Sequence, residues 1–260
     1  MPGQIRIELD GAIAHLVVSH PERRNAITSA MWRELTAAAR SLDADARVRV
    51  VVLRGDGDLA FVSGADISQF EAARSGRNAF AYNEENDLAF DSVASIGKPV
   101  VALIHGFCIG GGCALALTAD LRFCAEDAVF AIPAARLGLG YSAGGLAVLE
   151  RIVGLANAKE LFLTARRFDA QEALRMGLVN RVLPKSGLDA FVAEQCARIA
   201  ENAPLTLRAA KRALLDAGRP AHAREPEAVQ AEIQACFESA DYAEGVRAFL
   251  EKRKPGFQGR

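Results

Sequence analysis

Residues 104–140, IHGFCIGGGCALALTADLRFCAEDAVFAIPAARLGLG, contain each kind of element from which this chain is built. An apolar strand, Pro99–Ile104, leads into the stretch, and the glycines at 110–112 open a helical run over Cys113–Thr118. Two short apolar segments then read as strands, Leu121–Cys124 and Val129–Ile132. Strands, turns and helices in this order, with such short connections, predict an α/β fold with mostly parallel strands.

The same alternation begins upstream of this stretch. Ile5–Leu9 and Ala12–Val18 alternate apolar and polar residues around Asp10-Gly11, which predicts a two-stranded hairpin. Thr28 is placed to cap a helical pattern that runs to Leu42, and Val48–Leu53 follows as a buried strand. We expect a loop over 61–66 and helical segments over about 67–95.

The C-terminal part of the chain has a different pattern. From about residue 190 the strand signal ends, and Ala-rich helical periodicity follows over 191–201, 205–215, 228–237 and 242–252. We therefore predict an α/β core at 1–190 and a helical region at 191–260.

Composition favours a soluble protein that binds a small molecule. The chain has 260 residues, of which 51% are hydrophobic, and its 31 basic and 32 acidic residues give a net charge of -1. Because the basic residues are scattered, we expect no nucleic-acid partner. The N-terminus lacks a signal-peptide pattern and the apolar stretches are too short to cross a bilayer, so we predict a cytoplasmic protein without a membrane partner.

Cysteine and histidine spacing give no indication of a metal site. The five cysteines, at 108, 113, 124, 196 and 236, form no C-x-x-C pair, and the four histidines show no ligand spacing. We predict buried thiols at Cys108 and Cys113, and no metal ion.

Five blocks of sequence carry a family resemblance: HPERRNAI, AFVSGADI, the 104–140 stretch, ARRFDAQEALRMGLVNRVLP and EGVRAFLEKRKPGF. In this order and spacing they resemble the crotonase (enoyl-CoA hydratase/isomerase) superfamily, over nearly the whole chain. The resemblance implies a spiral of β-β-α units with a helical C-terminal trimerisation region, and a homotrimer or homohexamer. It also implies an acyl-CoA thioester as substrate or ligand, without a prosthetic group.

The resemblance assigns an oxyanion hole to the backbone amides of Ala65 and Gly111. A thioester enolate needs two such donors where negative charge develops, and a helix that begins near Gly111 adds positive potential there. By the same resemblance, coenzyme A would contact several further residues: Arg23, Arg24, Ala60, Ala65, Asp66, Ile67 and, from a neighbouring subunit, Phe249 and Lys252.

The pattern breaks where the hydratases of this family carry two glutamates. Those positions hold Ala114 and Ala134 here. Because each acid-base group contributes about 10² to 10⁴ in rate, we expect poor hydratase turnover. Asp87, Asp91 and the Glu84-Glu85 pair lie in a helical segment over the expected acyl pocket, and the sequence does not say which of them enters it.

Residues 140–144, GYSAG, have the G-x-S-x-G spacing of a serine-hydrolase elbow. The preceding residues make a poor strand, so we interpret the glycines as a turn into a helix that begins near Ala143. Tyr141 and Ser142 remain candidate proton carriers. Three functions stay open: a hydratase/isomerase-type enzyme, a malonyl-type acyl-CoA decarboxylase that uses Tyr141 and Ser142, and a non-catalytic acyl-CoA binding protein.

Overall fold

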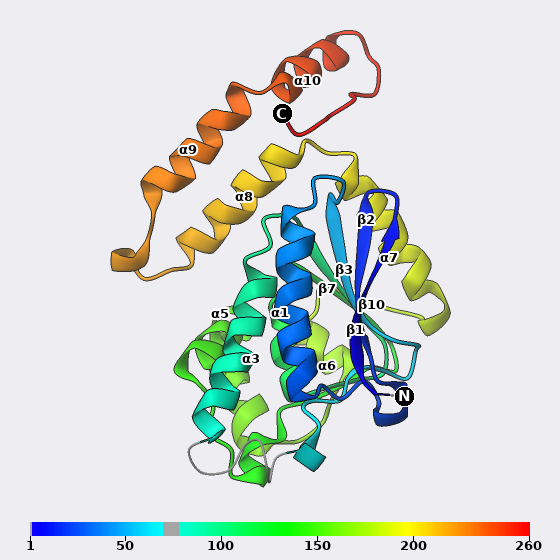
Figure 1. The fold of residues 1–260 in the computed structure, drawn as a ribbon, viewed down its shortest axis with the longest axis vertical. Helices are drawn as coiled ribbons and strands as arrows, with labels where there is room; N and C mark the ends of the chain where they lie inside the picture. The colour runs from blue at the N-terminus through cyan, green and yellow to red at the C-terminus, as the bar shows by residue number, and fades with distance from the viewer. Residues whose placement is uncertain (1, 70–77) are drawn as a thin grey trace.

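The protein, described by a computed structural model over residues 2–69 and 78–260, contains two β-sheets wrapped by helices (Figure 1). The first sheet has the strand order β1-β2-β3-β5-β7-β10, and the second has the order β4-β6-β8-β9. The strands of the first sheet are β1 Gln4–Asp10, β2 Ile13–Ser19, β3 Val50–Gly55, β5 Val100–Ile104, β7 Leu121–Ala125 and β10 Arg181–Leu183. Those of the second are β4 Ala60–Val62, β6 Phe107–Ile109, β8 Val129–Ala131 and β9 Phe168–Asp169.

Each turn of the chain adds one strand to each sheet and then a helix. β3 and β4 lead to α3, Asn78–Ala94, and β5 and β6 lead to α4, Gly111–Leu117. β7 and β8 lead, through a 3-10 turn at Pro133–Leu137, to α5, Ala143–Thr164. Strands of successive turns pair in parallel in both sheets, while β1 with β2 and β8 with β9 are antiparallel. The predicted α/β fold and spiral of β-β-α units are confirmed.

The N-terminal predictions are confirmed in detail. The hairpin pairs Asp10 with Ile13 around Gly11, whose positive φ suits the turn. The helix α1, Ser29–Ala44, begins where predicted, because the Thr28 side chain accepts a hydrogen bond from the Met31 amide. Its apolar face carries the fully buried Trp32 into the main core, which lies between the two sheets and α1, α3 and α5.

In the second sheet, β8 lies within the predicted strand Val129–Ile132, whereas the other short strands differ from the prediction. The expected loop over 61–66 contains the end of β4, and β6 was not predicted at all. A three-residue strand is too short to show an alternating pattern, and these strands are held by their neighbours in the sheet. For the helical segments expected over 67–95, the structure has a 3-10 turn at Ile67–Gln69 and α3 from Asn78. Residues 70–77 lie outside the described part of the chain.

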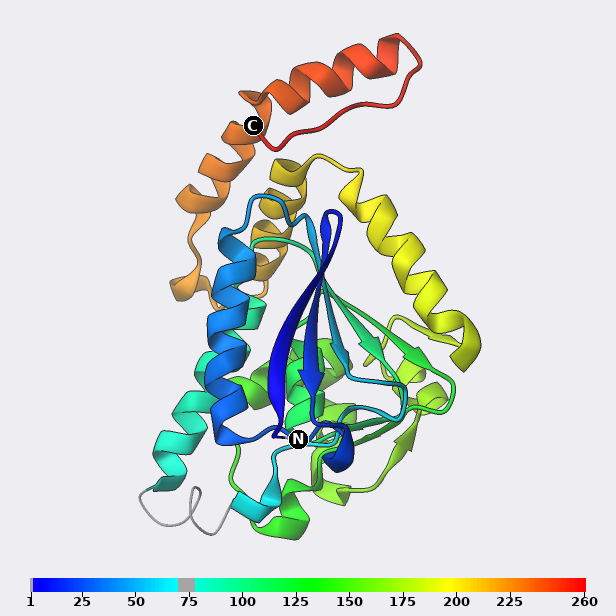
Figure 2. The same cartoon turned by 45° about the vertical axis from the view of Figure 1, so that its right-hand side comes forward.

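The C-terminal third is helical, apart from the short strands β9 and β10. Its helices are α6 Ala170–Arg175, α7 Lys185–Ala200, α8 Pro204–Ala217, α9 Pro226–Phe237 and α10 Ala240–Leu250, with a 3-10 turn at Ala221–Ala223. α7 covers the face of the first sheet opposite α1 (Figure 2), where Leu188 and Val192 pack among Val50 and Val101. The division predicted at residue 190 therefore falls inside α7.

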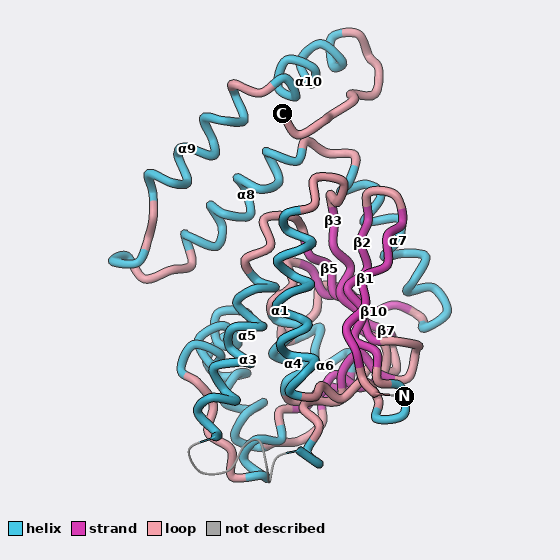
Figure 3. Tube along the Cα trace, viewed as in Figure 1, coloured by secondary structure: helices cyan, strands magenta, loops and turns pink. Residues whose placement is uncertain are grey.

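The helices α8 to α10 extend from one end of the molecule, away from both sheets (Figure 3). The Lys211 ammonium ties α8 to the core through Asp120 at 2.8 Å and the Lys98 carbonyl at 3.0 Å. In the described residues, none of the helices is both long enough and apolar enough to span a bilayer.

Candidate active site

Two backbone amides, those of Ala65 and Gly111, lie close together at the N-terminus of α4. Gly111 is the first residue of this helix, so its amide has no acceptor within the helix. Ala65 forms an isolated parallel bridge with Ile27, in which the Gly64 carbonyl and the Asp66 amide make the hydrogen bonds, both of 2.9 Å. This pattern leaves the Ala65 amide free to face the other way. The Ala65 nitrogen lies 3.8 Å from where a Cβ on Gly111 would stand.

The neighbouring glycines have different roles. A Cβ on Gly112 would collide with the carbonyl oxygen of Val62, so glycine is needed there for α4 to pack on β4. A Cβ on Gly111 would make ordinary contacts at 3.5 Å or more. Gly112 thus serves packing, while Gly111 has room for a Cβ beside the Ala65 amide.

The indole of Trp32 forms a wall beside the amide pair. Its Cζ2 and Cη2 atoms lie 3.5 and 3.6 Å from the Cβ position of Gly111. The indole also donates a hydrogen bond to Tyr82 Oη at 3.2 Å and packs edge-on against Phe90, with ring centroids 5.2 Å apart. Trp32 therefore fixes α3 next to the amides. The sequence placed Trp32 on a helix, but a lone apolar residue gives no signal that separates a pocket wall from ordinary core.

Ser142 is the N-cap of α5, which begins at Ala143. The GYSAG stretch is therefore a turn into a helix, as predicted from the sequence. The Ser142 Oγ accepts a hydrogen bond from the Gly145 amide at 3.2 Å and donates one to Asp87 Oδ1 at 3.4 Å. The residue follows a 3-10 turn and coil instead of a strand, and His222 lies exposed on the distant 3-10 turn between α8 and α9. Tyr141 is half-buried and packs edge-on against Phe162, with centroids 5.2 Å apart.

Arg23 and Arg24 are exposed on a turn that is held against the Ala65 segment. Ser63 donates to the carbonyls of both, through its amide to Arg24 at 3.1 Å and its hydroxyl to Arg23 at 3.0 Å. The Arg24 guanidinium also lies over the Phe107 ring, 4.8 Å from its centroid. The structure thus holds the turn that carries both predicted phosphate-binding residues against Ser63, two residues before Ala65.

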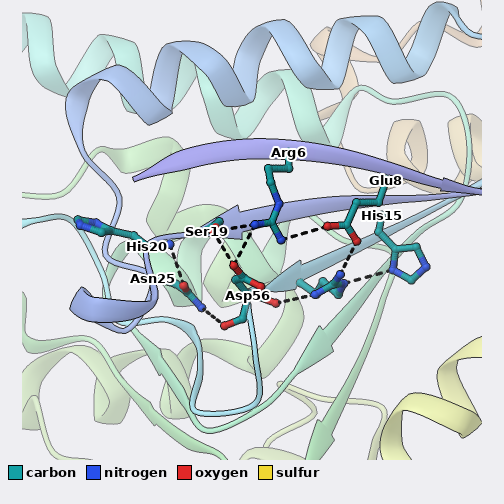
Figure 4. Close-up of polar contacts among 9 residues, drawn as sticks. Arg6, Glu8, His15, Ser19, His20, Asn25 and Asp56 are labelled. Carbon is teal, nitrogen blue, oxygen red and sulfur yellow. Dashed lines mark hydrogen bonds and ion pairs between the residues drawn. The ribbon is translucent and has the colours of Figure 1, made fainter. Parts of the chain in front are cut away.

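A partly buried polar network supports this turn (Figure 4). Asn25 adopts a positive φ, accepts a hydrogen bond from the His20 amide at 3.0 Å and donates to the Ala60 and Asp56 carbonyls at 2.8 and 3.1 Å. The Asp56 carboxylate accepts from Ser19 at 2.6 Å and from Arg6 at 3.1 Å.

The hydrogen bond from Ser19, followed by the bond and charge of Arg6, lowers the pKa of the Asp56 carboxyl. Asp56 therefore remains ionised and keeps its contacts with Ser19 and Arg6. Through its backbone carbonyl it also accepts from Asn25, which follows Arg23 and Arg24 in the turn.

Comparison with known proteins identifies the family of this chain. The sequence profile of the enoyl-CoA hydratase/isomerase family matches residues 8–260. The chain is 34% identical to a short-chain-enoyl-CoA hydratase of Clostridium acetobutylicum, over 98% of this chain and 97% of that protein. The chain belongs to the enoyl-CoA hydratase/isomerase family.

Two further matches cover nearly the whole chain. It is 36% identical to a peroxisomal Delta(3,5)-Delta(2,4)-dienoyl-CoA isomerase of Arabidopsis thaliana, over 97% of this chain and 95% of that protein. A crystal structure of an enoyl-CoA hydratase/carnithine racemase from Magnetospirillum magneticum superposes with a TM-score of 0.92 at 38% identity, covering 98% of this chain and 96% of that one. The crotonase resemblance and its fold are thereby confirmed.

Within this family fold, both expected glutamate positions carry methyl groups. Ala114 is half-buried, one helical turn beyond the Gly110 carbonyl to which its amide donates at 3.1 Å. Ala134 lies in the 3-10 turn before α5 and is only 2% exposed. Neither side chain can accept or donate a proton. Arg136, in the same turn, is exposed.

The predicted coenzyme A strip is only partly assembled at the surface. Asp66 is buried, and hydrogen bonds from the Ser68 hydroxyl at 2.7 Å and amide at 3.1 Å lower its pKa. Ile67 is 59% exposed beside it, whereas Ala60 is 1% exposed and faces the interior. Ala65, Asp66 and Ile67 thus share one edge of the site, and the side chain of Ala60 is not part of that edge.

Phe249 lies on α10 and Lys252 follows it, and α10 lies at one end of the molecule, away from both sheets (Figure 1). Phe249 is 83% exposed on α10, and Lys252 follows the helix with a positive φ. Phe249 borders an apolar groove of about 680 Å³ formed by α8, α9, α10 and the C-terminal tail. Within a single chain these two residues are not brought to the site.

In the part of the chain that the structure describes, no three His, Cys, Asp or Glu side chains cluster as metal ligands would. Cys108, Cys113, Cys124 and Cys196 are buried free thiols, and burial raises the pKa of Cys124 to about 12. These thiols are core groups.

Proposed function

We propose that this protein binds an acyl-CoA thioester and stabilises the enolate that forms from it. The observation that carries the proposal is the proximity of the Ala65 amide to the Gly111 amide at the start of α4. Such preorganised donors stabilise a thioester oxygen most strongly when it becomes negatively charged. Arg23 and Arg24, exposed on the turn that Ser63 holds beside Ala65, would meet the phosphates of coenzyme A.

Hydration is not the reaction that this site favours. Adding water to an enoyl thioester needs one group to activate the water and one to protonate the α-carbon, and Ala114 and Ala134 supply neither. Without those two groups, each worth about 10² to 10⁴ in rate, we infer that crotonyl-CoA hydration is slow. The similarity to a hydratase supports an acyl-CoA thioester as the ligand. Ala114 and Ala134 argue against hydration as the reaction.

We propose that the assembly is a homotrimer or a dimer of trimers. The apolar groove along α8 to α10 supports this, together with exposed Leu214, Phe249 and Leu250 on the same helices, at 76%, 83% and 74%. A surface this apolar is typical of a subunit interface. Native mass spectrometry should show three or six copies, and a monomer at micromolar concentration would contradict the assembly.

Calorimetric titration tests the proposed ligand. Butyryl-CoA should bind more tightly than free coenzyme A, because the thioester oxygen meets the two amides. The same sample should hydrate crotonyl-CoA poorly. Equal binding of acylated and free coenzyme A, or no binding of either, would contradict the proposal.

A further inference from the structure

One carboxylate from α3, that of Asp87, contacts Ser142 at the N-cap of α5. Trp32 holds α3 in place through Tyr82 and Phe90, and the same indole borders the amide pair. Asp87 lies three residues before Phe90, so the two residues are neighbours on the helix surface.

On its other side Asp87 meets Ser142, eight residues beyond Ala134, at the start of α5. The Asp87 carboxylate therefore lies on the helix that Trp32 holds beside the amide pair, and it contacts the N-cap of α5.

The surroundings of Asp87 suit a group that gains and loses a proton. Its carboxyl is half-buried, and burial, followed by the negative charge of Asp91 on the same helix, raises its pKa. The Ser142 hydroxyl, from α5, donates a hydrogen bond that acts in the opposite direction. Among the described residues no cation forms an ion pair with Asp87, so its oxygens are not committed to a salt bridge. The 3.4 Å separation from Ser142 is long, as catalytic contacts often are before a substrate binds.

We propose, on the basis of the function proposed above, that Asp87 is the single proton-transferring residue of this site and that Ser142 positions it. One carboxylate is enough to move a double bond. Asp87 removes a proton from Cγ of a 2-enoyl thioester, and the C–H electrons form the Cβ–Cγ double bond. The π electrons of the former Cα–Cβ double bond form a double bond between Cα and the thioester carbon, and the carbonyl π electrons move onto the oxygen. The product is a dienolate whose oxygen the two amides hold.

The resulting Asp87 carboxylic acid then returns the proton to Cα, which yields the 3-enoyl thioester and regenerates the carboxylate. Every atom and electron pair is conserved without a co-reactant, and the reverse path is equally available. The substrate class is thus 2- and 3-enoyl-CoA thioesters that the site interconverts.

Solvent deuterium exchange and isomerisation test this role. Wild type is incubated with butyryl-CoA in D2O, and incorporation at Cα is followed by mass spectrometry; conversion of a 3-enoyl-CoA is followed by the absorbance of the conjugated product. Asp87→Asn should lose about 10² to 10⁴ in both rates while calorimetry shows unchanged butyryl-CoA binding. Glu84→Gln removes the same charge from an exposed position on α3 and should leave both rates unchanged.

The outcomes separate the two proposals. An Asp87→Asn protein that binds, exchanges and isomerises like wild type overturns the role of Asp87 and leaves the proposed function standing. A wild-type protein that binds butyryl-CoA but neither exchanges nor isomerises also overturns the role of Asp87. A wild-type protein that does not bind it contradicts the proposed function itself.

Ser142→Ala gives an independent readout if Asp87→Asn does not fold. The rate rises with pH as Asp87 ionises, and loss of the hydroxyl raises the pKa of Asp87, so the midpoint of that rise should move to higher pH. A uniformly lower rate with an unmoved midpoint would show that Ser142 only caps α5, and would overturn its positioning role.

Discussion

The carbonyl oxygen of Val62 occupies the space that a Cβ on Gly112 would need, whereas the adjacent Gly111 has room for one. Gly112→Ala must therefore push α4 away from β4, and we expect it to lower the free energy of unfolding by about 1–3 kcal/mol. Gly111→Ala is the matched control and should retain the stability of wild type. Urea denaturation of both variants measures the difference, and equal stabilities would contradict the packing role of Gly112.

Asn25 should stabilise both the fold and the binding of coenzyme A. Asn25→Ala removes three hydrogen bonds and leaves buried backbone groups unpaired, so we expect a loss of about 2–3 kcal/mol in the free energy of unfolding. The variant should also bind coenzyme A more weakly, since the turn with Arg23 and Arg24 loses its support. Asn25→Asp keeps the acceptor for the His20 amide and should be intermediate. A stable alanine variant with unchanged affinity would contradict this account of the network.

Acid should weaken the network through Asp56. Because its folded-state pKa is lowered, Asp56 contributes stability above its ordinary value of 3.8, and this contribution is lost as pH falls through the lower folded-state pKa. Ser19→Ala removes the largest cause of that shift, so its acid-dependent loss of stability should be smaller than in wild type and should be complete at a higher pH. Thermal melts from neutral to acidic pH follow the effect, and Asp56→Asn should remove this part of the pH dependence. Superposable profiles for wild type and Ser19→Ala would refute it.

Restoring the two carboxylates should restore hydration. Ala114→Glu places an acid one turn beyond the amide pair, and the double variant Ala114→Glu, Ala134→Glu should hydrate crotonyl-CoA faster than wild type by about 10² or more. Because Ala134 is buried, Ala134→Glu alone should be the less stable single variant. Loss of enoyl absorbance measures the rate. A wild-type rate as high as that of the double variant would show that another group already activates water.

The sequence was sufficient where local pattern and spacing determine structure. The D-G hairpin, the Thr28 cap and the alternation around residues 104–140 predicted a mostly parallel α/β fold, and the family resemblance added the spiral of β-β-α units and the proposal of the amide pair. The three-residue strands β4 and β6 were missed because their pairing is non-local.

Only tertiary contacts distinguish the surroundings of Asp87 from those of the other three acidic residues, Asp91, Glu84 and Glu85. All four have the same side-chain chemistry on one helix, and only the packing of α3 against Trp32 and the start of α5 brings Asp87 to Ser142. The role of Trp32 was hidden for the same reason, since its position in the sequence is that of any buried helical residue.

The most direct test of the account is the effect of the Gly111 amide on exchange at Cα. Gly111 is the first residue of α4, a position that tolerates proline, so Gly111→Pro removes the amide hydrogen from a folded protein, which circular dichroism can verify. Deuterium incorporation into butyryl-CoA should fall by about 10² to 10³ relative to wild type while binding of free coenzyme A persists. A folded Gly111→Pro protein that exchanges at the wild-type rate would contradict the central claim that this amide holds the enolate oxygen.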